Sequence, residues 1–118
     1  MSKSWQVIYY VSIRGDVPVK NFLDTATPRL KTKALRILFQ LEEYGLQTVI
    51  PHIKKLSGSS LWEVRILGGE STRILFVIKV GKQIVLLHAF YKKTQKTPLK
   101  EIATAMTRLK DYEGRTGN

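Results

Sequence analysis

The chain has 118 residues, 43% of them hydrophobic, which suits a single domain with a modest core. It has no cysteine, which excludes disulfide bonds and thiol chemistry, and its two histidines and scattered carboxylates do not indicate a metal site. No apolar run reaches the roughly 18 residues of a membrane span, and residues 1–6 lack the apolar block of a signal peptide. We therefore expect a cytoplasmic protein that uses neither a metal nor a cofactor and has no membrane partner.

The charge is strongly basic. A formal net charge of +11 arises from 20 Lys and Arg against 9 Asp and Glu. Such an excess attracts polyanions, so nucleic acid is the leading class of partner. Between positions 49 and 100, ten basic residues stand against two acids. This clustering favours a functional basic surface over a charge that only keeps the protein soluble.

The first half of the chain predicts one strand and two helices. Aromatic and β-branched residues alternate over residues 5–12, as in a strand. A short helix is expected over residues 19–24. A longer one has Thr27 as its N-cap, Pro28 at its first position and Gly45 as its C-cap. Its apolar residues recur at three- and four-residue steps and form one stripe: Leu30, Ala34, Ile37, Leu38, Leu41 and Tyr44.

The second half predicts an antiparallel meander. Three strands are expected over residues 61–67, 73–80 and 83–91. Gly68 and Gly69 mark the first turn, and Gly81 with Lys82 suits a two-residue hairpin loop.

A last helix is predicted to begin at Thr97 and Pro98, which repeat the cap-then-proline pattern, and to end near Gly114. Residues 115–118 are expected to fray. The predicted fold is a single α+β domain with the order β-α-α-β-β-β-α and an antiparallel-rich sheet packed against helices.

Strand parity predicts where the basic residues point. Pairing across a two-residue loop sets Leu75 opposite His88 and Arg73 opposite Phe90. Arg73, His88 and Phe90 then share one sheet face, toward which Arg65 of the preceding strand also points. The opposite face of the hairpin is apolar and is expected to pack under the helices: Ile74, Phe76, Ile78, Val85, Leu87 and Ala89.

Two arginines on one face suit a phosphate, because guanidinium groups donate paired hydrogen bonds to its oxygens. Lys92 continues the same face, and Lys54 and Lys55 lie in the loop before the sheet. Single-stranded RNA fits this surface better than a duplex, because an aromatic ring can stack on an unpaired base.

The aromatic and histidine side chains have structural interpretations as well. Phe90 and Tyr91 are candidates for base stacking, but for Tyr91 core packing is an equal alternative. Core packing is favoured for Trp62. A histidine within an apolar strand, such as His88, is more often a structural residue than a catalyst.

Several motifs, taken together, resemble the RelE/HigB toxin superfamily of type II toxin–antitoxin systems, and within it the phage-derived HigB-like branch. The motifs are Lys54-Lys55-Leu56 with Gly58, Leu61-Trp62-Glu63-Val64-Arg65, Arg73, His88-Ala89-Phe90-Tyr91-Lys92-Lys93, and Lys96-Thr97-Pro98 with Glu101-Ile102-Ala103. The resemblance implies the same β-α-α-β-β-β-α order. It also implies an endoribonuclease that cuts mRNA, usually in the ribosomal A site, and that pairs with an antitoxin, often of helix-turn-helix type.

Carried over by position, the resemblance implies that Arg65 and Arg73 grip the scissile phosphate and that Lys92 and Lys93 form the basic cluster after the last strand. The chain departs from well-known members because no tyrosine stands early in its last helix. A tyrosine general base is therefore not supported.

The resulting hypothesis is metal-independent cleavage by attack of the ribose 2′-OH. Arg65 and Arg73 would stabilise the transition state, and Lys92 or Lys93 would transfer a proton. The predicted RNA-binding residues are Lys54, Lys55, His88, Phe90, Tyr91 and Lys96.

Two other functions are open from the sequence. A non-catalytic RNA- or ribosome-binding module would use the same basic face. A DNA-binding regulator would read a groove with the last helix, although no helix-turn-helix pair is apparent. Any silencing partner is expected to present acidic residues or an amphipathic helix to the basic groove.

Overall fold

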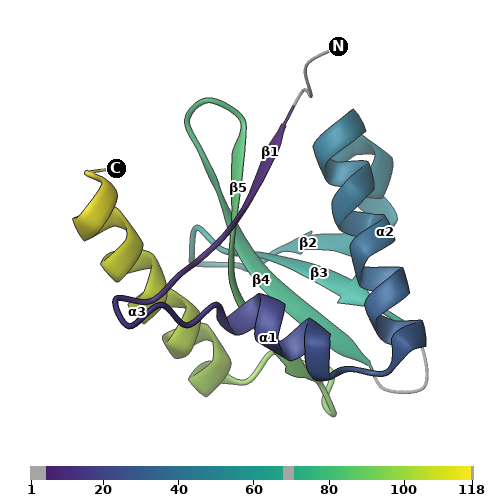
Figure 1. Ribbon diagram of the computed structural model, residues 1–118. Helices are drawn as coiled ribbons and strands as arrows, with labels where there is room; N and C mark the ends of the chain where they lie inside the picture. Colours follow the sequence, from purple (N-terminus) through teal and green to yellow (C-terminus); the bar gives the residue numbers. More distant parts are fainter. Residues whose placement is uncertain (1–4, 68–70, 118) are drawn as a thin grey trace.

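A computed structural model describes residues 5–67 and 71–117. In this part of the chain a five-stranded sheet carries two helices on one face and a third helix on the other (Figure 1). The elements are β1 (Gln6–Tyr9), α1 (Pro18–Thr25), α2 (Pro28–Tyr44), the 3₁₀ helix η1 (Leu46–His52), β2 (Ile53–Lys55), β3 (Trp62–Ile66), β4 (Thr72–Lys79), β5 (Gln83–Tyr91) and α3 (Leu99–Thr116).

The sheet is mixed. Its strand order is β1-β5-β4-β3-β2, in which β1 runs parallel to β5 and every other neighbouring pair is antiparallel. The predicted α+β class is confirmed, but the predicted element order lacked one strand. Lys54 and Lys55 belong to β2, which pairs with β3, and not to a loop. A three-residue edge strand is too short to show an alternating pattern in the sequence.

The predicted limits of α2 are confirmed. The Thr27 hydroxyl accepts a hydrogen bond from the Leu30 amide at 3.2 Å, and Pro28 occupies the first turn. Gly45 ends the helix with a φ of 85°, and a Cβ there would lie 2.7 Å from the Trp5 ring nitrogen. Glycine is therefore required both by the backbone conformation and by the close approach of Trp5.

The start and the end of α3 differ from the prediction. Pro98 is itself the N-cap and, as a proline, has no polar side-chain atom to cap the helix. The hydroxyl of Thr97, the predicted cap, is bonded to Glu63 instead. At the other end the helix does not stop near Gly114 but continues through Thr116. Arg115 and Thr116 are therefore helical, and residue 118 of the tail that was expected to fray lies outside the described residues.

The hairpin between β4 and β5 also differs. Lys79 pairs with Gln83, so the loop has three residues, and the predicted two-residue loop is wrong. Gly81 and Lys82 both have positive φ, at 85° and 59°. A register shift between Leu75 and Phe76 then adds one residue to β5. The predicted turn at Gly68 and Gly69 lies outside the described residues.

This shift restores the predicted pairs further along the hairpin, where Leu75 faces His88 and Arg73 faces Phe90. Nearer the loop, the residues of β5 point to the faces opposite to those predicted. Val85 and Leu87 were expected on the same face as Ile74 and Phe76, which lies under α1 and α2, but they pack on the α3 side. Their places on the α1 and α2 side are taken by Ile84 and Leu86.

The sheet is buried on both faces, so there are two cores. One lies between the sheet and α1 with α2, and the other between the sheet and α3 (Figure 1). Neighbouring residues of β4, such as Leu75 and Phe76, are therefore both fully buried on opposite faces. The unbroken apolar runs of β4 and β5 follow from this double burial. None of the described helices is long and apolar enough to cross a membrane.

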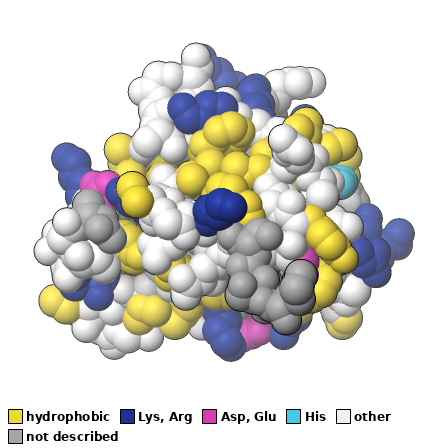
Figure 2. Space-filling model, turned by 90° about the horizontal axis from the view of Figure 1, so that it is seen from above, with side chains coloured by type: hydrophobic (Ala, Val, Ile, Leu, Met, Phe, Trp, Pro, Cys, Tyr) yellow, Lys and Arg dark blue, Asp and Glu magenta, His cyan; other side chains and the backbone are white. Residues whose placement is uncertain are grey.

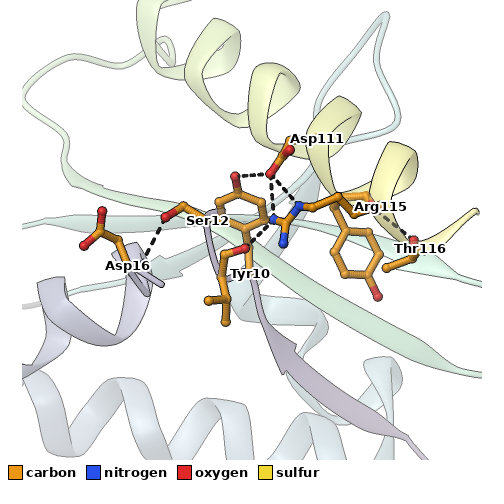
Figure 3. A network of polar contacts seen from close by, with 8 residues as sticks. Tyr10, Ser12, Asp16, Asp111, Arg115 and Thr116 are labelled. Carbon is orange, nitrogen blue, oxygen red and sulfur yellow. Dashed lines mark hydrogen bonds and ion pairs between the residues drawn. The ribbon is translucent and has the colours of Figure 1, made fainter. Parts of the chain in front are cut away.

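A polar network ties the C-terminal part of α3 to the end of β1 (Figure 3). The buried Tyr10 hydroxyl donates to Asp111 Oδ2 at 2.6 Å, and Arg115 donates to the same oxygen. Arg115 also donates to the Val11 carbonyl and lies over the Tyr10 ring, 5.7 Å from its centroid. Burial raises the pKa of Tyr10, which keeps its hydroxyl a donor.

Replacing Tyr10 with phenylalanine should lower the free energy of unfolding by about 1 kcal/mol, because one partly buried hydrogen bond is lost. Urea denaturation monitored by circular dichroism measures this change. Tyr44→Phe is the matched control, since that side chain is 67% exposed. Equal midpoints for Tyr10→Phe and the wild type would show that the network does not hold α3.

Candidate nucleic-acid interface

A pocket of about 400 Å³ opens where β3 ends, β4 begins and the chain leaves β5. We call it the basic pocket. It is lined by five cations, one acid and three uncharged polar residues: Lys54, Arg65, Arg73, Lys92, Lys93, Glu63, Ser71, Thr94 and Gln95. Positive charge therefore dominates the lining.

Two arginines meet across neighbouring strands of this pocket. Arg65 of β3 is paired directly with Arg73 of β4, so the two side chains leave the same face of the sheet. The predicted common face is thus confirmed. Like charges directly opposite each other destabilise a sheet. Such a pair is typical of a site that binds an anion.

Each guanidinium is held by one backbone carbonyl. Arg65 Nη2 donates to the Pro51 carbonyl at 3.2 Å, and Arg73 Nη1 donates to the Thr72 carbonyl at 3.1 Å. The Nε atoms of both arginines are buried and have no hydrogen-bond partner within the described residues. A buried donor without a partner costs about 1–3 kcal/mol, which a bound oxyanion would offset.

Glu63 is the one acid of the lining, and its side chain is only 1% exposed. Its Oε1 lies 3.3 Å from Arg73 Nε and 3.7 Å from Lys92 Nζ, as ion pairs. The Thr97 hydroxyl donates to Oε2 at 2.5 Å. One carboxylate thus faces two buried cations, and an excess of positive charge remains.

Lys92 extends from the end of β5 and has a side chain that is only 6% exposed. Its backbone amide donates to the Ser71 carbonyl at 2.8 Å, which holds the segment against the start of β4. Burial lowers the pKa of Lys92, Glu63 opposes this shift, and Arg73 and Lys54 add to it. A lysine with a lowered pKa is better suited to proton transfer near neutral pH.

The other predicted basic residues divide between the pocket and the rest of the surface. Lys93 is exposed and lines the pocket, as does Lys54. Lys55 is not part of the lining: its ammonium donates to the Ser59 carbonyl and lies 6.0 Å from the Trp62 ring centroid. Lys96 is exposed and also outside the lining.

The basic charge is not confined to the pocket. Figure 2 shows one face of the surface, on which Lys and Arg lie around the margin and also beside hydrophobic side chains. The net charge alone would therefore not single out a candidate site, whereas the arginine pair distinguishes the basic pocket from the rest of the surface.

The predicted aromatic residues do not line the pocket. Phe90 is 6% exposed and belongs to the core beneath α3, so its ring is not available to a base. Tyr91 is exposed, but its ring packs on Phe22 of α1 with centroids 4.8 Å apart. The contact with α1 puts Tyr91 on the sheet face opposite to Arg73.

His88 shares the sheet face of Arg73 but is engaged by α3. Arg108 Nη1 lies 3.0 Å from Nδ1 and donates to it, which leaves the ring proton on Nε2 to bond Glu101 Oε1 at 2.7 Å. The ring also stacks on Phe90, with centroids 5.4 Å apart. Burial lowers the pKa of His88, Glu101 opposes this shift and Arg108 adds to it. These contacts fit the structural interpretation of His88.

Sequence reasoning missed part of the pocket. It placed no role on Glu63, although a charged residue between Trp62 and Val64 in a buried strand was a signal. Nothing in the local sequence indicated that Thr97 would reach Glu63, because the two residues are 34 positions apart. Ser71, Thr94 and Gln95 had no distinguishing pattern either.

The depressed pKa of His88 predicts a pH-dependent stability. The folded state takes up the proton at lower pH than the unfolded chain, whose value is near 6.5. The free energy of unfolding should therefore fall as the pH drops below 6.5, by at most about 1.4 kcal/mol per unit. Urea denaturation between pH 7.5 and 5.5 should show a shallower slope for His88→Gln. Equal slopes in the wild type and in His88→Gln would contradict the assignment.

Comparison with known protein families identifies the family of this chain. Residues 21–110 match the family model described as Phage derived protein Gp49-like (DUF891), and this segment contains every lining residue of the basic pocket. A comparison with curated proteins gives no match. The Gp49-like family is associated with the toxins of toxin–antitoxin systems. The chain belongs to the Gp49-like family of phage-derived proteins.

Proposed function

We propose that this protein is the toxin of a type II toxin–antitoxin system of RelE/HigB type and that it cuts mRNA on the ribosome, without a metal ion. Membership of the Gp49-like family supports a toxin with an antitoxin partner. The observation that carries the nuclease proposal is the cross-strand pair of Arg65 and Arg73. Each has a buried Nε–H that makes no hydrogen bond within the described residues, although Arg73 Nε lies 3.3 Å from Glu63 Oε1 as an ion pair. Such donors suit the oxygens of a scissile phosphate.

The proposed reaction is an internal phosphoryl transfer. The ribose 2′ oxygen attacks the adjacent phosphorus, the bond from phosphorus to the 5′ oxygen breaks, and the products carry a 2′,3′-cyclic phosphate and a 5′-hydroxyl. Arg65 and Arg73 stabilise the negative charge that develops on the phosphorane-like transition state. The reaction needs no oxidant or second substrate, so positioning and charge are what the pocket supplies.

Proton transfer to the leaving oxygen is assigned to Lys92. Lys92 donates a proton to the departing 5′ oxygen, a role that its burial and lowered pKa favour. The proton of the 2′-hydroxyl passes to water, and Lys93, which is exposed at the pocket, adds positive charge beside the phosphate. Glu63 is buried and already bonded by Thr97, so we assign it no proton transfer.

The proposed dependence on the ribosome rests on which side chains line the pocket. His88 is engaged by α3, and no histidine lines the pocket among the described residues. Without a strong base, cleavage of free RNA should be slow, and a ribosome that orients the 2′-hydroxyl in line with the leaving oxygen would raise the rate. The same positive charge favours an antitoxin that places acidic side chains in the pocket.

Replacing either arginine should abolish most of the cleavage. Arg65→Gln and Arg73→Gln should each lower the rate by about 10²–10³-fold, because each removes a donor to the transition state. Mapping of mRNA 5′ ends after induction, and cleavage of mRNA on purified ribosomes, measure this loss. Circular dichroism is used to check that each variant is folded.

Two controls separate an enzyme from a binding module. Arg14→Gln removes an exposed arginine that lies outside the pocket and should cut like the wild type. An mRNA with a 2′-deoxyribose at the cut nucleotide should bind but resist cleavage. Cutting of the deoxy substrate would refute the 2′-OH mechanism. If the wild type binds ribosomes and never yields a product, the protein is a non-catalytic RNA- or ribosome-binding module.

A further inference from the structure

Glu63 uses both oxygens of its buried carboxylate. Oε1 faces the two cations Arg73 and Lys92, while Oε2 accepts the hydrogen bond from Thr97. Thr97 directly precedes Pro98, the N-cap of α3. The carboxylate therefore joins β3 to β4, to the segment after β5 and to the start of α3.

Stability alone does not account for this cluster. Removing two cations and one carboxylate from water is costly, and well-packed apolar residues often replace a buried ion pair without loss. Here the Arg73 Nε lacks a hydrogen bond although Glu63 is near, and Lys92 Nζ is 3.7 Å from the shared oxygen. The carboxylate orders the cations without saturating them, so they keep capacity for a second anion.

We propose that Glu63 is a positioning residue, which holds Arg73 and Lys92 in the geometry that receives the scissile phosphate, and that Thr97 fixes Glu63 in turn. The inference rests on the proposed function of the pocket. Glu63 touches no RNA in this arrangement and acts through Arg73 and Lys92.

The charges around Lys92 give this role a measurable consequence. Lys92 is faced by Glu63 from β3, by Arg73 from β4 and by Lys54 from β2. Glu63 is the one carboxylate in that group, and it favours the protonated ammonium. Loss of its charge should therefore lower the pKa of Lys92 further.

The first experiment measures that titration directly and does not depend on cleavage. The ¹³Cε resonance of Lys92 is followed against pH by NMR in the wild type and in Glu63→Gln. The Lys92 midpoint should move to lower pH in the variant. Glu113→Gln is the matched control: it removes a carboxylate that pairs with Lys79 outside the pocket, and it should leave Lys92 unchanged.

The second experiment separates positioning from a structural role. For Glu63→Gln on ribosome-bound mRNA, kcat should fall by an order of 10²-fold, as for a misplaced catalytic group. KM should stay equal or fall, because the pocket loses a negative charge. The alkaline limb of the pH–rate profile should move to lower pH together with the Lys92 midpoint.

Thr97→Val keeps the carboxylate charge and removes only the hydroxyl that holds it. It should lower kcat less than Glu63→Gln does and leave KM unchanged, and it provides the same test if Glu63→Gln does not fold. Thr104→Val is its control, because that hydroxyl bonds the Lys100 carbonyl within α3.

Failure of this inference can be distinguished from failure of the proposed function. A wild type that never cuts RNA overturns the nuclease proposal, whereas the NMR titration still tests the link between Glu63 and Lys92. An unchanged Lys92 midpoint in Glu63→Gln overturns the inference. A rise in KM that matches the loss of kcat, accompanied by a lower melting temperature, assigns Glu63 a structural role and overturns it as well.

Discussion

The central constraint of this structure is that two buried cations share one buried carboxylate. Arg73 and Lys92 both face Glu63 Oε1. Arg65, on the neighbouring strand β3 and the same face of the sheet as Arg73, adds a third positive charge. Within the described residues of the pocket no second acid balances them. Because charge without a counter-ion is costly away from water, the pocket is stabilised by any anion that fits it. A phosphate of an RNA backbone, the anion of the proposed function, would meet that requirement.

The fold makes such a charged pocket tolerable. Helices cover both faces of the sheet, so β4 and β5 are held on two sides by apolar packing (Figure 1). The pocket lies at the end of these strands, beside the start of α3. A rigid platform keeps Arg65 and Arg73 opposed despite their repulsion.

The location of Lys92 depends on an irregularity in β5. The extra residue near Leu87 reverses the alternation of the strand, so that Phe90 and then Lys92 follow the side of Arg73. Without this bulge Lys92 would leave the opposite face. The alternation assumed from the sequence still placed Lys92 on the correct face of the sheet. The assumed loop was one residue too short and the extra residue of the bulge was not expected, so the two errors cancel.

Local sequence patterns determined the α+β class, the limits of α2 with its Thr27 and Gly45 caps, and the common face of Arg65 and Arg73. These features depend on neighbouring residues or on the two-residue period of a strand, which a sequence shows directly. Only the tertiary structure decided that Glu63 meets Thr97, that Phe90 is buried under α3 and that Tyr91 packs on Phe22. These contacts join residues far apart in the chain, and they are set by how the helices close over the sheet, which no local pattern encodes.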